Sequence, residues 1–198
     1  MSTPLPRSPE LMNPTDTALL VVDVQERLLA VQPQGPRIEW NCRRLLDGAA
    51  TLGVKTAVTE QYPEKLGPTA ETLLAKTAEP ALEKIQFSCG ERGEVFSGWL
   101  EEGLHRVLLA GIETHVCVQQ TALDLLAAGF QVFVAVDAVG SRYKVDHGIA
   151  LRRMEASGVL LTTTEATLFE WCERAGTPEF KAISALAKEK PPKGCGTV

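Results

Sequence analysis

The sequence has little that would support a metal, disulfide or nucleotide site. It contains only three histidines and five cysteines in 198 residues. The cysteines form no C-x-x-C pair, and neither they nor the histidines show the spacing of zinc ligands. A disulfide framework is not expected in a chain of this size and class. Neither G-x-G-x-x-G after a strand nor G-x-x-x-x-G-K-[ST] occurs, so dinucleotide and P-loop nucleotide binding lack support.

Long apolar runs are also missing. No run approaches the length of a membrane span, and the N-terminus lacks the charged-then-apolar pattern of a signal peptide. We therefore expect a cytoplasmic protein with no membrane partner. Nonspecific nucleic-acid binding needs a basic face, whereas the formal net charge here is −5, so nucleic acid is not an expected partner.

Short apolar runs alternate with helical periods along most of the chain, and no internal repeat or interior linker divides it. This alternation predicts a single α/β domain over residues 15–190 on a mostly parallel sheet. A proline-rich extended arm (1–14) precedes this domain and a tail (191–198) follows it. The expected strands are residues 18–23, 54–59, 83–89, 106–110, 131–136 and 159–162. The expected helices are 37–52, 93–102, about 116–128, 146–156, one beginning at 164, and 178–188, with a short helical turn within 69–75.

Two polar residues follow expected strands. Asp23 ends a continuously apolar strand, where open α/β sheets bind ligands, although a turn or cap aspartate is an equal alternative. Cys117 falls in the first turn of a helix, where free N–H groups and the helix dipole favour a thiolate nucleophile; the alternative is a buried filler. Right-handed crossovers bring the carboxyl ends of parallel strands to one edge. We therefore expect Asp23, Cys117 and the loop 59–68 to lie together at this edge. The residue types alone predict that Lys84 is a solvated surface charge.

Three motifs in order carry a family resemblance over residues 17–164. They are ALLVVDVQE at 18–26, EKIQFS at 83–88 and GIETHVCVQQTALDL at 111–125. With them the chain resembles the isochorismatase-like cysteine hydrolases, and QYPEKLGPT at 61–69 is most similar to their isochorismatase-domain-containing branch. The resemblance implies a three-layer α/β/α, Rossmann-like domain whose mostly parallel six-stranded sheet has the order 3-2-1-4-5-6.

The resemblance also implies a site. It makes Asp23, Lys84 and Cys117 a catalytic triad, and so raises Lys84 from a surface charge to a catalytic residue. It implies a cis peptide bond between Ile112 and Glu113, with the backbone N–H groups of Glu113 and Cys117 forming an oxyanion hole. Gln61, Tyr62 and His115 are the substrate-pocket candidates.

Two departures narrow the chemistry. Nicotinamidases of this family hold a metal through histidines after the second strand, but residues 59–62 read TEQY, so we predict no metal and no cofactor. True isochorismatases lack the nucleophilic cysteine that is present here. The resemblance thus implies a hydrolase that cleaves a small amide-like or related acyl substrate through a thioester.

Alternatives to this reading stay open. One is a catalytically weak metabolite-binding or scaffolding protein with the same fold. Another is a redox-sensing role for Cys117, although the sequence has no resolving cysteine near it. Family members commonly form dimers or tetramers, so a homo-oligomer is expected. The tryptophans fit either an interface or a core; they are Trp40, Trp99 and Trp171.

Overall fold

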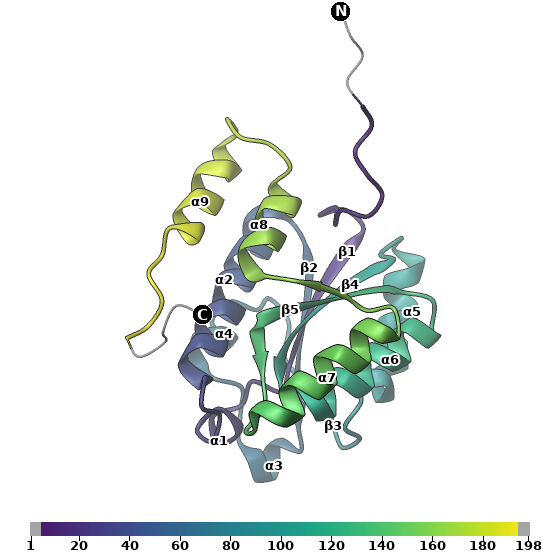
Figure 1. Cartoon of the computed structure of the whole chain (residues 1–198), viewed down its shortest axis with the longest axis vertical. Helices are drawn as coiled ribbons and strands as arrows, with labels where there is room; N and C mark the ends of the chain where they lie inside the picture. Colours follow the sequence, from purple (N-terminus) through teal and green to yellow (C-terminus); the bar gives the residue numbers. More distant parts are fainter. Residues whose placement is uncertain (1–4, 194–198) are drawn as a thin grey trace, which may run out of the picture.

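The computed structural model describes residues 5–193 and has a six-stranded parallel sheet at its centre. The sheet has the order β3-β2-β1-β4-β5-β6, which confirms the order implied by the resemblance (Figure 1). The strands are β1 (Thr17–Val22), β2 (Lys55–Gln61), β3 (Leu82–Lys84), β4 (Arg106–Ile112), β5 (Gln131–Gly140) and β6 (Leu160–Thr162).

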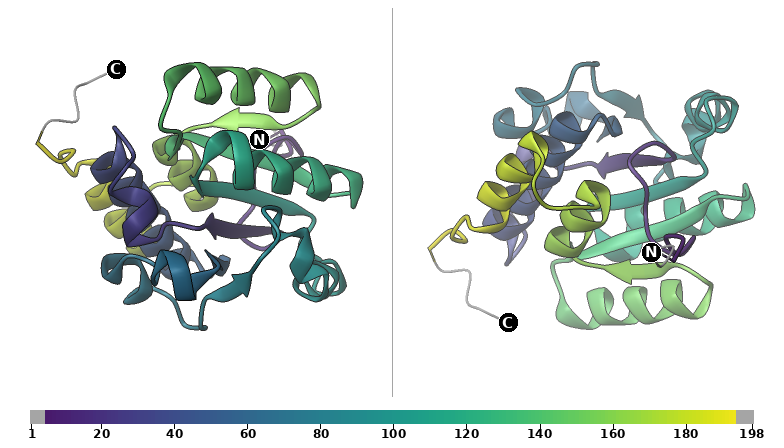
Figure 2. Two further views of the ribbon diagram at one scale, coloured as in Figure 1. Left: turned by 90° about the horizontal axis from the view of Figure 1, so that it is seen from below. Right: turned by 90° about the horizontal axis from the view of Figure 1, so that it is seen from above.

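The central strands are covered on both faces. Every residue of β1 is buried, which explains why its sequence is continuously apolar instead of alternating. One face carries α2, whose apolar side packs with Trp171 of α8; the other carries α5, α6 and α7 (Figure 2). The longer helices are α2 (Gly35–Leu52), α5 (Gly93–Glu101), α6 (Gln119–Ala127), α7 (Lys144–Ala156), α8 (Thr164–Cys172) and α9 (Pro178–Ala187).

Local signals set several helix ends. Thr163 and Thr177 cap α8 and α9, because each side chain accepts a hydrogen bond from a backbone N–H in the first turn. Gly53 ends α2 in the left-handed conformation that glycine adopts without strain. Because threonine caps and a terminal glycine can be recognised in the sequence, the expected bounds of these long helices differ from the observed bounds by only a few residues.

The third strand is shorter than expected. Residues 83–89 were expected to be extended, but β3 ends at Lys84, and residues 89–92 form a 3-10 turn, η1 (Cys89–Arg92). The reason lies in the hydrogen bonds after Lys84: the N–H groups of Ile85 and Gln86 both donate to the Glu91 carboxylate, at 2.7 Å each. This local pairing replaces further pairing with β2.

Three short helices lie where no full helix was expected. They are α1 (Glu26–Leu29), α3 (Pro63–Leu66) and α4 (Glu71–Leu74), and the last of these falls within the expected helical turn at 69–75. Each has four residues, too few to carry an amphipathic period. All three lie between β1 and β3 in the chain; α1 contacts α2 and α3, and α4 contacts α2.

The described part of the N-terminal arm contacts the rest of the molecule. The Arg7 guanidinium donates to the backbone carbonyls of Met12 at 2.9 Å and Glu170 at 2.6 Å, and Met12 is fully buried. Trp99 and Trp171 are buried in the core. The ends of the expected arm and tail, residues 1–4 and 194–198, lie outside the described residues. Within residues 5–193, no helix is long and apolar enough to cross a membrane.

Candidate active site

Asp23 follows the last residue of β1, between β2 and β4. Its backbone has a φ of 51°, a left-handed conformation that aspartate adopts more readily than most residues. Its N–H donates to the Thr59 carbonyl at 3.2 Å, and the residue is fully buried. The turn therefore directs a carboxylate into the protein at the carboxyl edge of the sheet.

Lys84 reaches the same point from β3. Gln61 at the end of β2 is its register partner, so Lys84 stands at the carboxyl end of its short strand, not at the entry side. Its ammonium donates to Asp23 Oδ2 at 2.7 Å, Gln61 Oε1 at 2.6 Å, and the carbonyls of Phe87 at 3.0 Å and Gln86 at 3.3 Å. Burial is the largest single effect and lowers the pKa of Lys84, but the Asp23 carboxylate together with Cys117 and Cys89 outweighs burial, so the net shift is upward. Lys84 is therefore a buried cation.

Cys117 lies in the first helical turn after β4. This turn is π-helical, η2 (Thr114–Val118), and it leads directly into α6. Cys117 is 6% exposed and packs in the same core cluster as Cys89. The Asp23 carboxylate and the Lys84 ammonium are the charged groups that act on its thiol.

The surroundings of Cys117 disfavour the thiolate form of its side chain. Burial and the nearby Asp23 carboxylate raise its pKa well above the ordinary value, and the Lys84 ammonium offsets only part of this rise. The expectation that the helix start alone would favour a thiolate is therefore wrong. The helix dipole is a partial charge, whereas burial and a full negative charge beside the sulfur both disfavour a second anion.

Glu113 fixes the turn that precedes Cys117. The Ile112–Glu113 peptide bond is cis, and the Glu113 carboxylate accepts hydrogen bonds from Gln32 Nε2 at 3.1 Å and from Arg142 N and Nε at 3.0 and 3.1 Å. Burial raises the pKa of Glu113, but the Gln32 and Arg142 hydrogen bonds outweigh burial and the net shift is downward. The side chain of Glu113 is therefore an anchor that fixes this turn.

The three pocket candidates differ in their surroundings. Gln61 is 8% exposed, and its amide is occupied because it accepts from Lys84 and donates to the Ile85 carbonyl at 2.6 Å. Tyr62 is 40% exposed, and His115 is partly exposed with its Nδ1 3.0 Å from Ser141 Oγ. Gln61 thus holds Lys84 in place, and Tyr62 and His115 are the more accessible of the three.

Sequence reasoning missed three residues at or next to this cluster. Thr59 Oγ1 donates to Asp23 Oδ1 at 2.7 Å, and the Cys89 thiol donates to Thr59 Oγ1 at 3.7 Å. The Gln25 side chain joins the segment after β1 to the end of β2. Its Nε2 donates to the backbone carbonyl of Gln61 at 3.0 Å, and its Oε1 accepts from the Gln61 backbone N–H at 2.9 Å. Their positions in the chain could have indicated two of them, because Thr59 ends the expected second strand and Gln25 is two residues after Asp23.

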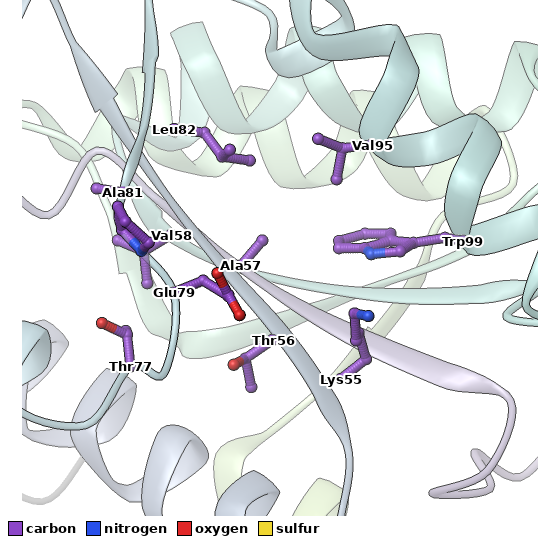
Figure 3. Close-up of a pocket in the computed structure, with 11 residues that line it drawn as sticks. Lys55, Thr56, Ala57, Val58, Thr77, Glu79, Ala81, Leu82, Val95 and Trp99 are labelled. Carbon is purple, nitrogen blue, oxygen red and sulfur yellow. The ribbon is translucent and has the colours of Figure 1, made fainter.

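A separate cavity lies away from this cluster. It has a volume of about 350 Å³ and lies between the start of β2, the segment 77–82 that leads into β3, and α5 (Figure 3). Trp99 and Val95 project toward it from α5, with Glu79 and Ala81 on the opposite side. None of the three triad candidates lines it. The described residues contain no group of three or more His, Cys, Asp or Glu side chains that could hold a metal ion.

The parallel sheet with helices on both faces defines a three-layer α/β protein. The chain belongs to the isochorismatase family, whose model, described as "Isochorismatase domain", matches residues 17–166. It therefore has the isochorismatase-family hydrolase fold.

Several relatives are similar over nearly the whole chain. Isochorismatase domain-containing protein 2A of Mus musculus is 39% identical over 90% of this chain and 86% of its own length. Isochorismatase domain-containing protein 1 of Danio rerio is 36% identical over 92% of this chain, which spans only 64% of that protein. The solved structure of the MAR1 ribonuclease of Caenorhabditis elegans has a TM-score of 0.86 and 40% identity, covering 95% of this chain and 98% of that one.

Proposed function

We propose that this protein is a cysteine hydrolase that cleaves a small amide-like or related acyl substrate through a covalent thioester. The observation that supports it best is the buried Lys84–Asp23 ion pair, whose two charges both act on the Cys117 thiol. A carboxylate, a fixed cation and a nucleophile at one point are what covalent acyl transfer requires. Because burial of two charges is costly, an ion pair at this position calls for a functional reason.

In the first half-reaction, Asp23 takes the proton from Cys117 as the sulfur attacks the substrate carbonyl. The tetrahedral intermediate collapses to a thioester on Cys117, and the leaving amine receives the proton that Asp23 carries. In the second half-reaction, Asp23 takes a proton from water as the water oxygen attacks the thioester. The carboxylic acid is released, and Asp23 returns the proton to the departing Cys117 sulfur, which restores the thiol and the carboxylate. Lys84 holds the Asp23 carboxylate in position in both steps.

The oxyanion of the intermediate would be bound by the backbone N–H groups of Glu113 and Cys117. The Glu113 side chain is already engaged with Gln32 and Arg142, which fixes this backbone without adding a free negative charge to the site. Tyr62 and His115 would contact the substrate at the mouth of the site. Preorganised donors of this kind stabilise the charge that develops in the transition state.

The test is a panel of small amides, carbamates and nitriles assayed with the wild type, Cys117→Ser and Cys117→Ala. We expect both variants to lose at least about 10³-fold in turnover. Intact-mass spectrometry with a slow substrate should show the acyl group on Cys117 of the wild type. Cys42→Ser is the matched control, because Cys42 is also buried but its thiol donates to the Ala138 carbonyl, away from the Asp23–Lys84 pair. Full turnover by Cys117→Ala would refute the scheme.

Two other functions are outcomes of the same experiment. The C. elegans relative is named a ribonuclease, so RNA belongs in the panel, although a net charge of −5 does not favour a polyanionic substrate. Tight binding of one metabolite with no turnover of any compound would favour a metabolite-binding or scaffolding protein. A cytoplasmic location stays a prediction from the sequence.

A further inference from the structure

The hydroxyl of Thr59 lies between the Asp23 carboxylate and a second buried thiol. Its oxygen is 2.7 Å from Asp23 Oδ1 and 3.7 Å from Cys89 Sγ. The Asp23 backbone N–H also lies 3.3 Å from the same oxygen. Thr59, Asp23 and Cys89 are all fully buried, so each of these groups depends on the others for its hydrogen bonds.

These contacts fix the direction of the Thr59 O–H. A hydroxyl has one proton to donate and two lone pairs that accept. The thiol of Cys89 is a donor at neutral pH, because burial raises its pKa to about 11. Since Cys89 S–H and Asp23 N–H both point to the oxygen, the single proton of Thr59 is left for Asp23 Oδ1.

Asp23 is therefore held at both oxygens by donors, Thr59 at Oδ1 and Lys84 at Oδ2. We propose that Thr59, oriented by Cys89, is a positioning residue that holds the Asp23 carboxylate in the orientation that faces Cys117. The proposal rests on the proposed function and adds to it two residues that do not touch the substrate. The titratable groups that face Asp23 are Lys84 from β3, Cys89 from η1 and Cys117 from η2.

The same segment links the base to the helix that carries the nucleophile. Cys89 N donates to Thr121 Oγ1 of α6 at 2.9 Å, and Ser88 Oγ donates to Asp124 of the same helix. Thr121 lies about one turn after Cys117 along the chain. The position of the Cys89 thiol is thus set by the element that positions Cys117.

The test is the rate at which iodoacetamide alkylates Cys117 as a function of pH, read by peptide mass spectrometry, which needs no knowledge of the substrate. Removing a donor from a carboxylate makes it hold a proton to higher pH. We expect Thr59→Val to move the acid limb of the profile up by about one pH unit and to lower the plateau rate. Thr59→Ser, which keeps the hydroxyl, should restore the wild-type profile.

Cys89 provides an independent pair of variants. Cys89→Ala should shift the acid limb in the same direction as Thr59→Val but by less, and Cys89→Ser, which still donates, should not shift it. Urea midpoints identify any variant that fails to fold, and a folded member of either pair suffices for the test. An unchanged profile in folded Thr59→Val or Cys89→Ala would overturn the proposal.

The Asp23→Asn variant separates this proposal from the proposed function. If Asp23→Asn abolishes the acid limb while Thr59→Val leaves it unchanged, Asp23 is the base and only the positioning role fails. If Asp23→Asn itself leaves the profile unchanged, Asp23 is not the base for Cys117, and the proposed function fails with it.

Discussion

At the scale of single residues, the Lys84–Asp23 ion pair is distinguished by its burial. Both side chains have no exposed surface, and Nζ lies 2.7 Å from Oδ2. The exposed pair between Lys55 and Glu102 has a similar distance of 3.1 Å, but its side chains are 48% and 52% exposed. Removal of one partner from a buried pair leaves an uncompensated charge, whereas solvent screens the exposed one.

We therefore expect Lys84→Met to lower the free energy of unfolding by about 3–5 kcal/mol, and Lys55→Met by less than about 1 kcal/mol. The double variant Asp23→Asn/Lys84→Met should recover a large part of the loss, because it leaves no buried charge alone. Urea denaturation of the four proteins measures all three differences. If Lys84→Met were no more costly than Lys55→Met, the pair would not be the buried ion pair described here.

The residues of the site were predictable to different degrees. Asp23 and Cys117 follow expected strands, and their convergence follows from parallel topology alone. Lys84 needed the family resemblance, because the expected strand 83–89 placed it at the entry side. The direction of the Cys117 pKa and the contacts of Thr59 and Cys89 depend on burial and side-chain geometry, which spacing along a chain does not encode.

At the scale of elements, the end of β4 depends on one glycine. Gly111 has a φ of 115°, and a Cβ placed there would lie 2.0 Å from the Val22 carbonyl oxygen of β1. That oxygen belongs to the backbone of the neighbouring strand, so it cannot move aside as a flexible side chain would. The strand that delivers Cys117 can therefore approach β1 only with glycine at this position.

We expect Gly111→Ala to lower the free energy of unfolding by about 4 kcal/mol or more. Gly98→Ala is the matched control: Gly98 lies within α5 with nothing within 4 Å of a built Cβ. That change should stabilise the protein by up to about 1 kcal/mol, the difference in helix propensity. Thermal and urea unfolding of both variants give the comparison, and equal stability of the two would contradict the close approach of β4 to β1.

The elements themselves were predictable in proportion to their length. The long helices and the apolar strands gave clear periods, and the resulting ranges hold to within a few residues, as for α2 and β1. In contrast, β3 has three residues on the edge of the sheet. Its end is set by a single carboxylate, Glu91, that captures two backbone N–H groups, a contact that no periodic pattern reveals.

At the scale of the whole molecule, the alternation of strands and helices in the sequence predicts the layers of the fold, but it does not predict the order of the strands in the sheet. Many parallel orders satisfy the same alternation, and the order 3-2-1-4-5-6 came with the family resemblance. The observed order makes β1 and β4 neighbours at the centre. It thereby places Asp23 and Cys117 on adjacent strand ends, although 93 residues separate them in the chain.

The outer face of α7 gives the expectation of a homo-oligomer a specific location. Two large side chains of α7 are exposed, Val145 by 69% and Ile149 by 51%, and Tyr143, the residue before the helix, is exposed by 64%. Val145 and Ile149 are four residues apart and so lie on one face of the helix. Exposed apolar clusters of this kind are typical of protein–protein contacts, and we propose that this face binds a second copy of the chain.

We expect the wild-type protein to sediment above the 21.4 kDa monomer at micromolar concentration, and Val145→Lys/Ile149→Lys to sediment as the monomer. Two lysines would place like charges opposite each other across a symmetric contact and would cost desolvation. Val31→Lys is the matched control, because Val31 is 55% exposed but lies outside α7, and it should leave the mass unchanged. A monomeric wild type would refute self-association. If the double lysine variant stays oligomeric, the contact lies on another face. The Cys117 alkylation rates of the oligomer and the monomer would then show whether the candidate active site depends on the second copy.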